Sequence, residues 1–140
     1  MKHEIQIRIV VVAPLAGVSM MVQEGKDKLL PPTRSSDDTI SFEFPINIDL
    51  SSGQPNFLGK FAQGPKDARF VYVNSGTYAG EHHSCWGRRA KLSLMSITRE
   101  QVEQAIADGS AIETRFPGVG RDGGPTCASV KGLEWKVVKR

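Results

Sequence analysis

The sequence has few cysteines, and the two it has lie far apart. Cys85 and Cys127 form no CxxC pair and match no metal-ligand spacing, which excludes the common cysteine-based metal and redox motifs. We expect two free thiols in a reducing cytosol, and a single disulfide is the alternative if the chain is exported. The sequence therefore indicates no metal and no other cofactor.

Long apolar runs are also absent. The N-terminal stretch IVVVAPLAGVSMMV (residues 9–22) is short and is interrupted by Pro14, so it is not a membrane span. It also fits a signal peptide poorly, because Glu4 lies in the would-be basic region and no A-x-A cleavage site follows. We therefore expect a cytoplasmic protein with no membrane partner.

The charge and the aromatic content do not favour a nucleic-acid partner. The net charge is +3 and only 7% of the residues are aromatic. Arg88, Arg89 and Lys91 cluster on one expected strand, where a solvated face explains them. Nucleic-acid binding calls for exposed aromatic side chains between the basic ones. The aromatic candidates are Tyr72, Tyr78 and Trp86, and we expect the aromatic residues to serve the core instead; the oligomeric state stays open.

The most informative stretch that is present is ISFEFPINIDL, residues 40–50. Every even position is apolar and every odd position is polar or proline. Because successive side chains of a strand point to opposite faces, this pattern predicts one long strand with a core face and a water face. Pro45 has no N–H to donate, so the strand should lie at an edge, bulge there, or bend between two sheets.

Shorter patterns predict the other elements. Alternating runs predict strands at residues 4–12, 18–22, 69–74, 88–94, 111–116, 127–130 and 133–138. The charged segment 23–38 predicts a solvated loop, and the glycine-interrupted segment 56–64 an irregular packed loop. Thr98 and Gln101 form a capping box that predicts one helix, which Gly109 ends.

The fold class follows from these elements. Fourteen glycines and eight prolines indicate many turns. We expect a single β-rich domain over residues 1–140, mainly β with one helix. Its architecture should be an antiparallel β-barrel or a two-sheet β-sandwich of about eight strands.

Several runs of the chain resemble a known family. The runs are NFLGKFAQGP (56–65), ARFVYV (68–73), GTYAG (76–80), WGRRAKLSL (86–94) and PGVGRDGGPTCASV (117–130). They are similar to a bacterial family of unknown function, numbered 5990 among the domains of unknown function. The resemblance extends from about residue 5 onward and implies a small, single-domain bacterial protein. Since the family is uncharacterised, it implies no activity, ligand or catalytic residue.

The glycine-rich loop 118–124 is the first candidate site. Its glycines allow successive N–H groups to converge on an anion, and arginines on the loop and the preceding strand could add guanidinium groups. The loop lacks the Lys-Ser/Thr of a P-loop and opens no predicted helix. The predicted ligand-binding residues are Arg115, Gly118, Gly120, Arg121, Asp122, Gly123 and Gly124. The alternative is a wide turn in which Arg121 pairs with Asp122.

Two further hypotheses stay open beside a module that binds a small anionic ligand. The first is a hydrolase or metal-dependent enzyme built on the loop from His82 to Cys85, with Asp122 or Cys127. This loop lies outside the runs that resemble the family. Adjacent histidines such as His82 and His83 point to opposite faces of a regular strand, which argues against a shared metal. The other hypothesis is a protein-interaction module that pairs through an exposed strand edge.

Overall fold

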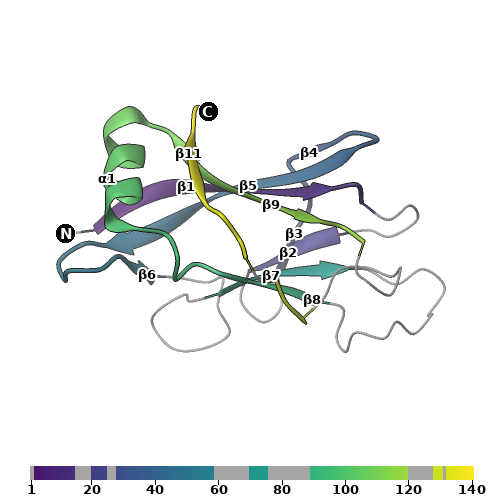
Figure 1. The fold of residues 1–140 in the computed structure, drawn as a ribbon, viewed down its shortest axis with the longest axis horizontal. Coiled ribbons are helices and arrows are strands. Elements are labelled where there is room, and N and C mark those ends of the chain that lie inside the picture. The colour runs from purple at the N-terminus through teal and green to yellow at the C-terminus, as the bar shows by residue number, and fades with distance from the viewer. Residues whose placement is uncertain are drawn as a thin grey trace.

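The computed structural model describes residues 2–14, 20–24, 28–58, 70–75, 89–119, 128–130 and 132–140. Within these ranges the chain forms two sheets and one helix (Figure 1). Sheet A contains β1 (Lys2–Val12), β4 (Arg34–Ser35), β5 (Thr39–Asp49), β6 (Asn56–Leu58), β9 (Ala111–Pro117) and β11 (Lys136–Val138). Sheet B contains β2 (Met20–Glu24), β3 (Lys28–Leu30), β7 (Phe70–Ser75), β8 (Arg89–Ser93) and β10 (Ala128–Ser129). The helix is α1 (Arg99–Asp108).

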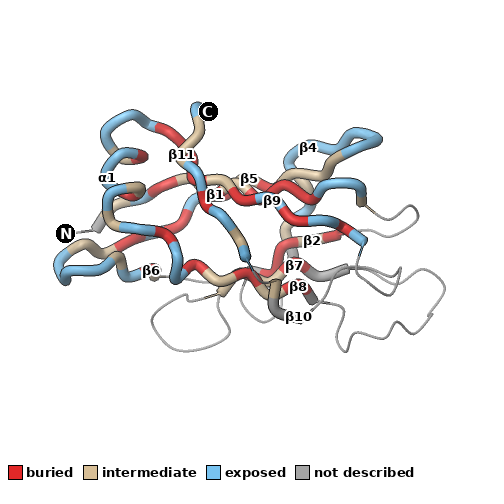
Figure 2. The backbone as a smooth tube through the Cα atoms, in the orientation of Figure 1, coloured by how far each residue is buried: buried red, intermediate tan, exposed pale blue. Residues whose placement is uncertain are grey.

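The two sheets pack face to face, so the fold is a β-sandwich rather than a barrel. Buried residues lie along the strands of both sheets (Figure 2). Ile7 and Phe44 of sheet A and Val71 and Leu92 of sheet B belong to one core cluster. Burying one face of each sheet is the usual way in which two sheets form a domain. No helix in the described part of the chain is long and apolar enough to cross a membrane.

The prediction of a long strand at residues 40–50 is confirmed by β5. Its even positions Phe42, Phe44, Ile46 and Ile48 are each at most 3% exposed. It pairs with β1 along the whole length of both strands, from Lys2 opposite Asp49 to Val12 opposite Thr39. The alternation therefore identified the central pair of sheet A and the face that it buries.

Pro45 lies on β5 where the outer edge of the strand has no strand partner. The β1–β5 register runs through Pro45 without a break, which excludes a bulge. On the other edge, β4 pairs with residues 40–41 and β6 with residues 47–49. Backbone groups at odd positions of β5 face this edge, because the N–H of Glu43 donates there to the Thr33 hydroxyl oxygen at 2.8 Å. The missing N–H of Pro45 thus falls in a gap between β4 and β6 and costs no ladder bond.

The sheets are mainly antiparallel, as predicted, with two parallel pairs. β9 runs parallel to β1, and β10 runs parallel to β8. Between β8 in sheet B and β9 in sheet A the chain forms α1. The strand order of sheet A is β11-β9-β1-β5-β4, with β6 also on β5.

The sequence pattern missed the short edge strands. The predicted loop 23–38 contains β3 and β4, and the predicted packed loop 56–64 begins with β6. These corrections raise the number of strands in the described residues from about eight to eleven. β4 is exposed at both residues, and such short edge strands show no apolar alternation. The last predicted strand, 133–138, is shorter, since β11 begins only at Lys136.

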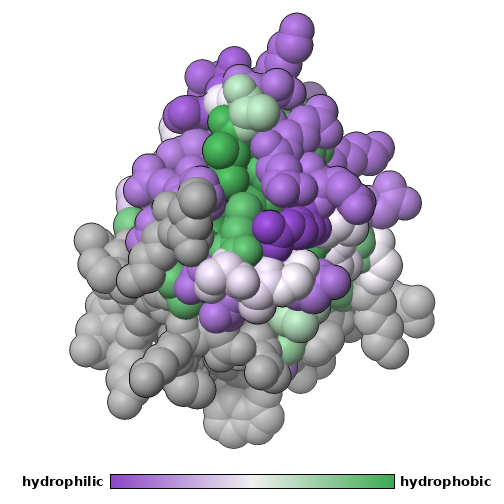
Figure 3. Space-filling view, turned by 90° about the vertical axis from the view of Figure 1, so that its left-hand side faces the viewer, coloured by the Kyte–Doolittle hydropathy of each residue, from purple (hydrophilic) through white to green (hydrophobic). Residues whose placement is uncertain are grey.

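The predicted helix is present with its capping box. The Thr98 side chain accepts from the Gln101 N–H, the Gln101 side chain accepts from the Thr98 N–H, and Gly109 ends the helix at φ 66°. The helix contacts β1, β9 and β11 and so covers one end of sheet A. At this end of the molecule an apolar band lies between polar flanks (Figure 3).

Candidate functional site

Most of the residues predicted to form a site lie outside the described residues. Arg115 lies on β9, where its side chain is 61% exposed, and Gly118 follows that strand. Outside the described residues lie Gly120, Arg121, Asp122, Gly123 and Gly124, together with His82, His83, Cys85 and Cys127. The anion-binding loop and the enzyme loop therefore stay predictions beyond these two residues.

The glycine at position 118 has a packing reason. Its N–H donates to the Val12 carbonyl oxygen at 2.8 Å. A Cβ at this position would lie 2.7 Å from Pro14 Cα and 2.9 Å from a methyl group of Val11. Glycine is thus needed for the close approach of the end of β9 to the end of β1. Its N–H is already engaged within the sandwich.

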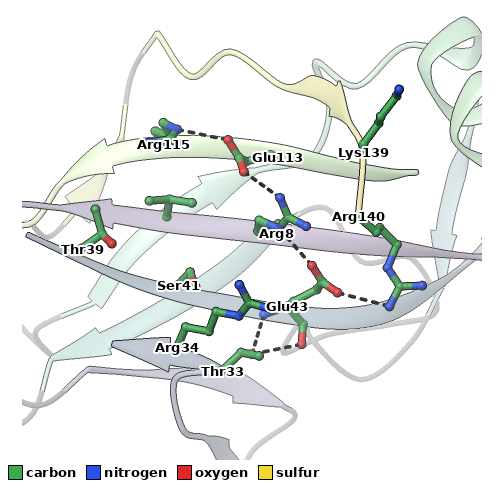
Figure 4. Close-up of a pocket in the computed structure, with 11 residues that line it drawn as sticks. Arg8, Thr33, Arg34, Thr39, Ser41, Glu43, Glu113, Arg115, Lys139 and Arg140 are labelled. Carbon is green, nitrogen blue, oxygen red and sulfur yellow. Dashed lines mark hydrogen bonds and ion pairs between the residues drawn. The ribbon is translucent and has the colours of Figure 1, made fainter. Parts of the chain in front are cut away.

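The described residues contain a hollow of about 620 Å³ on the outer face of sheet A (Figure 4). Its lining comes from outward positions of neighbouring strands and from the chain after β11. The lining residues are Arg8, Val10, Thr33, Arg34, Thr39, Ser41, Glu43, Glu113, Arg115, Lys139 and Arg140. Four arginines and one lysine against two glutamates leave a net charge of +3 around it.

One row of outward side chains across sheet A alternates in charge, and we call it the Arg8 row. The register places Lys136, Glu113, Arg8 and Glu43 directly opposite one another on successive strands. The Arg8 guanidinium donates to Glu43 at 2.9 Å and to Glu113 at 3.2 Å. Opposite charges at facing positions stabilise neighbouring strands. The Arg8 row is therefore close to neutral and structural.

The Arg8 row is joined to the C-terminal segment. Arg140 donates to the second carboxylate oxygen of Glu43 at 3.2 Å, so a chain of charged groups crosses the strands from Glu113 to Arg140 (Figure 4). Partial burial lowers the pKa of Arg8, but its hydrogen bonds to Glu43 and Glu113 raise it by more, and the net pKa lies above its ordinary value. The guanidinium is thus fixed in its charged form.

The next row along the strands has a different composition, and we call it the Arg34–Arg115 row. Its members, in order across the strands, are Arg115, Val10, Ser41 and Arg34. Positive charges stand at both ends, and the middle holds two short neutral side chains. Because Val10 and Ser41 are shorter than the arginines and glutamates around them, they form the floor of the hollow.

The positive charge of the Arg34–Arg115 row is only partly balanced. The Nε of Arg115 donates to Glu113 at 3.0 Å. The side chains of Arg34 and Lys139 form no hydrogen bond or ion pair with any residue that the structure describes. Guanidinium groups bind carboxylates and phosphates through paired N–H donors. The hollow therefore has the donors and the charge for an anion, and the Ser41 hydroxyl on its floor offers one more hydrogen-bonding group.

Sequence reasoning found Arg115 and missed the rest of this hollow. Arg8 and Glu43 occupy outward positions of strands that were predicted, and a polar outward face gave no reason to select them. The other cationic cluster named from the sequence does not join it. Lys91 lies on sheet B with its Nζ 4.0 Å from the centroid of the Phe70 ring. Arg88 lies outside the described residues.

The fold and the site define a two-sheet β-sandwich with a cationic hollow on one outer face. The chain belongs to the DUF5990 family, a family of unknown function, whose sequence model matches residues 5–138. This match confirms the resemblance seen in the sequence. Comparisons with curated proteins and with solved structures gave no match.

Proposed function

We propose that this protein binds a small anionic molecule in the hollow on the outer face of sheet A. The proposal is carried by the contrast between two neighbouring rows of side chains. The Arg8 row neutralises itself through direct ion pairs. The Arg34–Arg115 row ends in two arginines with no carboxylate between them. A ligand with negative charge would supply what the second row lacks.

The hollow is large enough for such a ligand, and one of its arginines is already held in position. Its volume of about 620 Å³ lies within the range of small-molecule sites. Glu113 forms ion pairs with Arg8 and with Arg115. Arg115 is therefore held in place by Glu113 before a ligand arrives. Preorganised donors lower the entropy that binding costs.

This proposal keeps one residue of the sequence-based hypothesis and relocates the centre of the site. Arg115 belongs to both. The segment 120–124 follows β9 in the chain, and its contribution to anion binding stays a prediction. The enzyme hypothesis on His82 and Cys85 also stays untested, since neither residue is described. The hypothesis of a protein-interaction module needs a long exposed strand at a sheet edge. In the described residues the edge strands β3, β4, β10 and β11 are only two or three residues long, which does not favour it.

Calorimetric titration with inorganic phosphate, sulfate and succinate tests the proposal. We expect at least one of these anions to bind the wild type, and to raise its melting temperature by mass action. Arg34→Gln and Arg115→Gln should each weaken binding. Both arginines are exposed in the fold, so their replacement should leave the circular dichroism spectrum unchanged.

Lys91→Gln is the matched control. It removes the same unit of charge from sheet B, where Lys91 packs over Phe70, and leaves the hollow intact. Unchanged binding in this control, with weaker binding in the two arginine variants, supports the hollow as the site. Equal weakening in all three variants would show only a net-charge effect, and no binding of any anion to the wild type would refute the proposal.

A further inference from the structure

The two arginines at the ends of the Arg34–Arg115 row stand on strands that are far apart in the sheet. Arg115 lies on β9 and Arg34 on β4, with β1 and β5 between them. Three spacings of about 4.8 Å between neighbouring strands place their backbones roughly 14 Å apart. Neither arginine is the direct neighbour of the other across any strand pair.

Arg115 is also held near its own strand. Its Nε donates to Glu113, two residues earlier on β9, at 3.0 Å. The side chain is therefore directed along β9 toward Glu113 and not across the floor (Figure 4). A compact anion bound to Arg115 in this position leaves Arg34 without a partner.

The floor between the arginines is short and uncharged. Val10 is 5% exposed, and it lies outside the core cluster between the sheets, so the longer side chains on the outer face surround it. Ser41 stands beside Val10 in the register and offers one hydroxyl. This floor suits a neutral segment of a ligand with room for one hydrogen bond.

We infer that the ligand is an elongated molecule with an anionic group at each end and a neutral middle. This inference rests on the proposed function. One anionic group binds the terminal nitrogens of Arg115, the other binds the guanidinium of Arg34, and the middle lies over Val10 and Ser41. Carboxylate and phosphate ends share this chemistry, because both accept paired N–H donors. A single compact anion satisfies only one of the two arginines.

Chain length in a series of linear α,ω-dicarboxylates tests the inference. The backbones of Arg34 and Arg115 lie roughly 14 Å apart, and the two arginine side chains cover part of that distance. Dicarboxylates of about four to ten carbons have lengths on both sides of the distance that remains. The comparison ligands are the monocarboxylates of equal length, the matching α,ω-bisphosphates, and inorganic phosphate, all titrated by calorimetry at one low ionic strength. The bisphosphate arm decides which type of anionic end the site prefers.

We expect affinity to pass through a maximum with chain length. At the maximum the dianion should bind about tenfold more tightly than the monocarboxylate of equal length, since it gains one charge-assisted contact. Arg34→Gln and Arg115→Gln should each reduce the best dianion to the affinity of the monocarboxylate and abolish the maximum. Lys91→Gln should retain both the maximum and the tenfold preference.

The two proposals fail in distinguishable ways. If inorganic phosphate or a monocarboxylate binds as tightly as the best dianion, the inference of two separated anionic groups is overturned and anion binding in the hollow stands. The same holds if affinity is independent of chain length. If no anion of any of these types binds the wild type, both the inference and the proposed function are overturned.

Discussion

Replacing Arg8 with methionine tests most directly whether the Arg8 row is structural and the Arg34–Arg115 row is not. Methionine keeps much of the side-chain length but removes the charge and both ion pairs. The Arg8 side chain is 24% exposed, and its partners Glu43 and Glu113 are 21% and 11% exposed. The variant leaves these two carboxylates on either side of an uncharged side chain. Arg140 and Arg115 still contact them, so part of the stabilisation is retained.

The magnitude follows from these contacts. Removing one partner of a charged hydrogen bond costs about 1.5–3 kcal/mol when the site is buried. Solvent screens pairs with this degree of exposure, so we expect the two lost bonds together to lower the free energy of unfolding by about 1–3 kcal/mol. This corresponds to a fall in melting temperature of about 3–10 °C for a chain of this size.

Urea denaturation of Arg8→Met measures this loss, with Arg115→Met as the matched control. The control is the same substitution on the same face, but the Arg115 side chain is 61% exposed, so its cost should stay below about 0.5 kcal/mol. In about 1 M NaCl the difference between the variants should shrink, because salt screens the ion pairs. If Arg8→Met is as stable as the wild type, or if Arg115→Met costs as much, the division into a structural row and a ligand row is refuted.

Three further predictions concern the fold and its pH dependence. Phe44→Ala should cost about 3–5 kcal/mol in urea denaturation, because the ring is 3% exposed in the core, and a wild-type melting curve would contradict the core assignment. Gly118→Ala should cost about 1–3 kcal/mol through its clash with Pro14 while leaving anion affinity unchanged; lost affinity with wild-type stability would reverse the roles given to this glycine. The side-chain and backbone hydrogen bonds of Ser51 lower the pKa of Asp49 to about 2. Since the pKa of Asp49 in the folded chain lies below its ordinary value of 3.8, this stabilisation is present above about pH 4 and is lost as the pH falls toward 2. Asp49→Asn should therefore flatten the stability profile in that window, and an unchanged profile would contradict the assignment.

The sequence allowed the centre of the fold to be predicted because one face of β5 is buried along its length. A strand with a buried face must alternate, and residues 40–50 do so without exception. The capping box at Thr98 was equally readable, since its partners lie three residues apart. β3 and β4 were missed because edge strands of two or three residues are too short to show an alternating pattern. The parallel pairing of β1 with β9 joins segments about a hundred residues apart, and no local pattern records it.

The site was less readable than the fold for the same reason. Arg115 was selected because a glycine-rich loop follows it in the chain. Arg34 was placed in a solvated loop, and Arg8 was one polar residue in an alternating strand. The row that joins Arg34 to Arg115 exists only in the register between four strands. Local patterns identify which side chains point outward, whereas the register decides which outward side chains stand beside one another.

The central claim is that an anion binds over the Arg34–Arg115 row, and an NMR titration tests it most directly. Backbone amide shifts of the ¹⁵N-labelled protein would be followed during addition of a linear dicarboxylate. The account predicts that the largest saturable shifts fall at Arg34, Ser41, Val10 and Arg115 on the outer face of sheet A. Saturable shifts confined to sheet B or to residues 120–124, or no saturable shift at all, would contradict it.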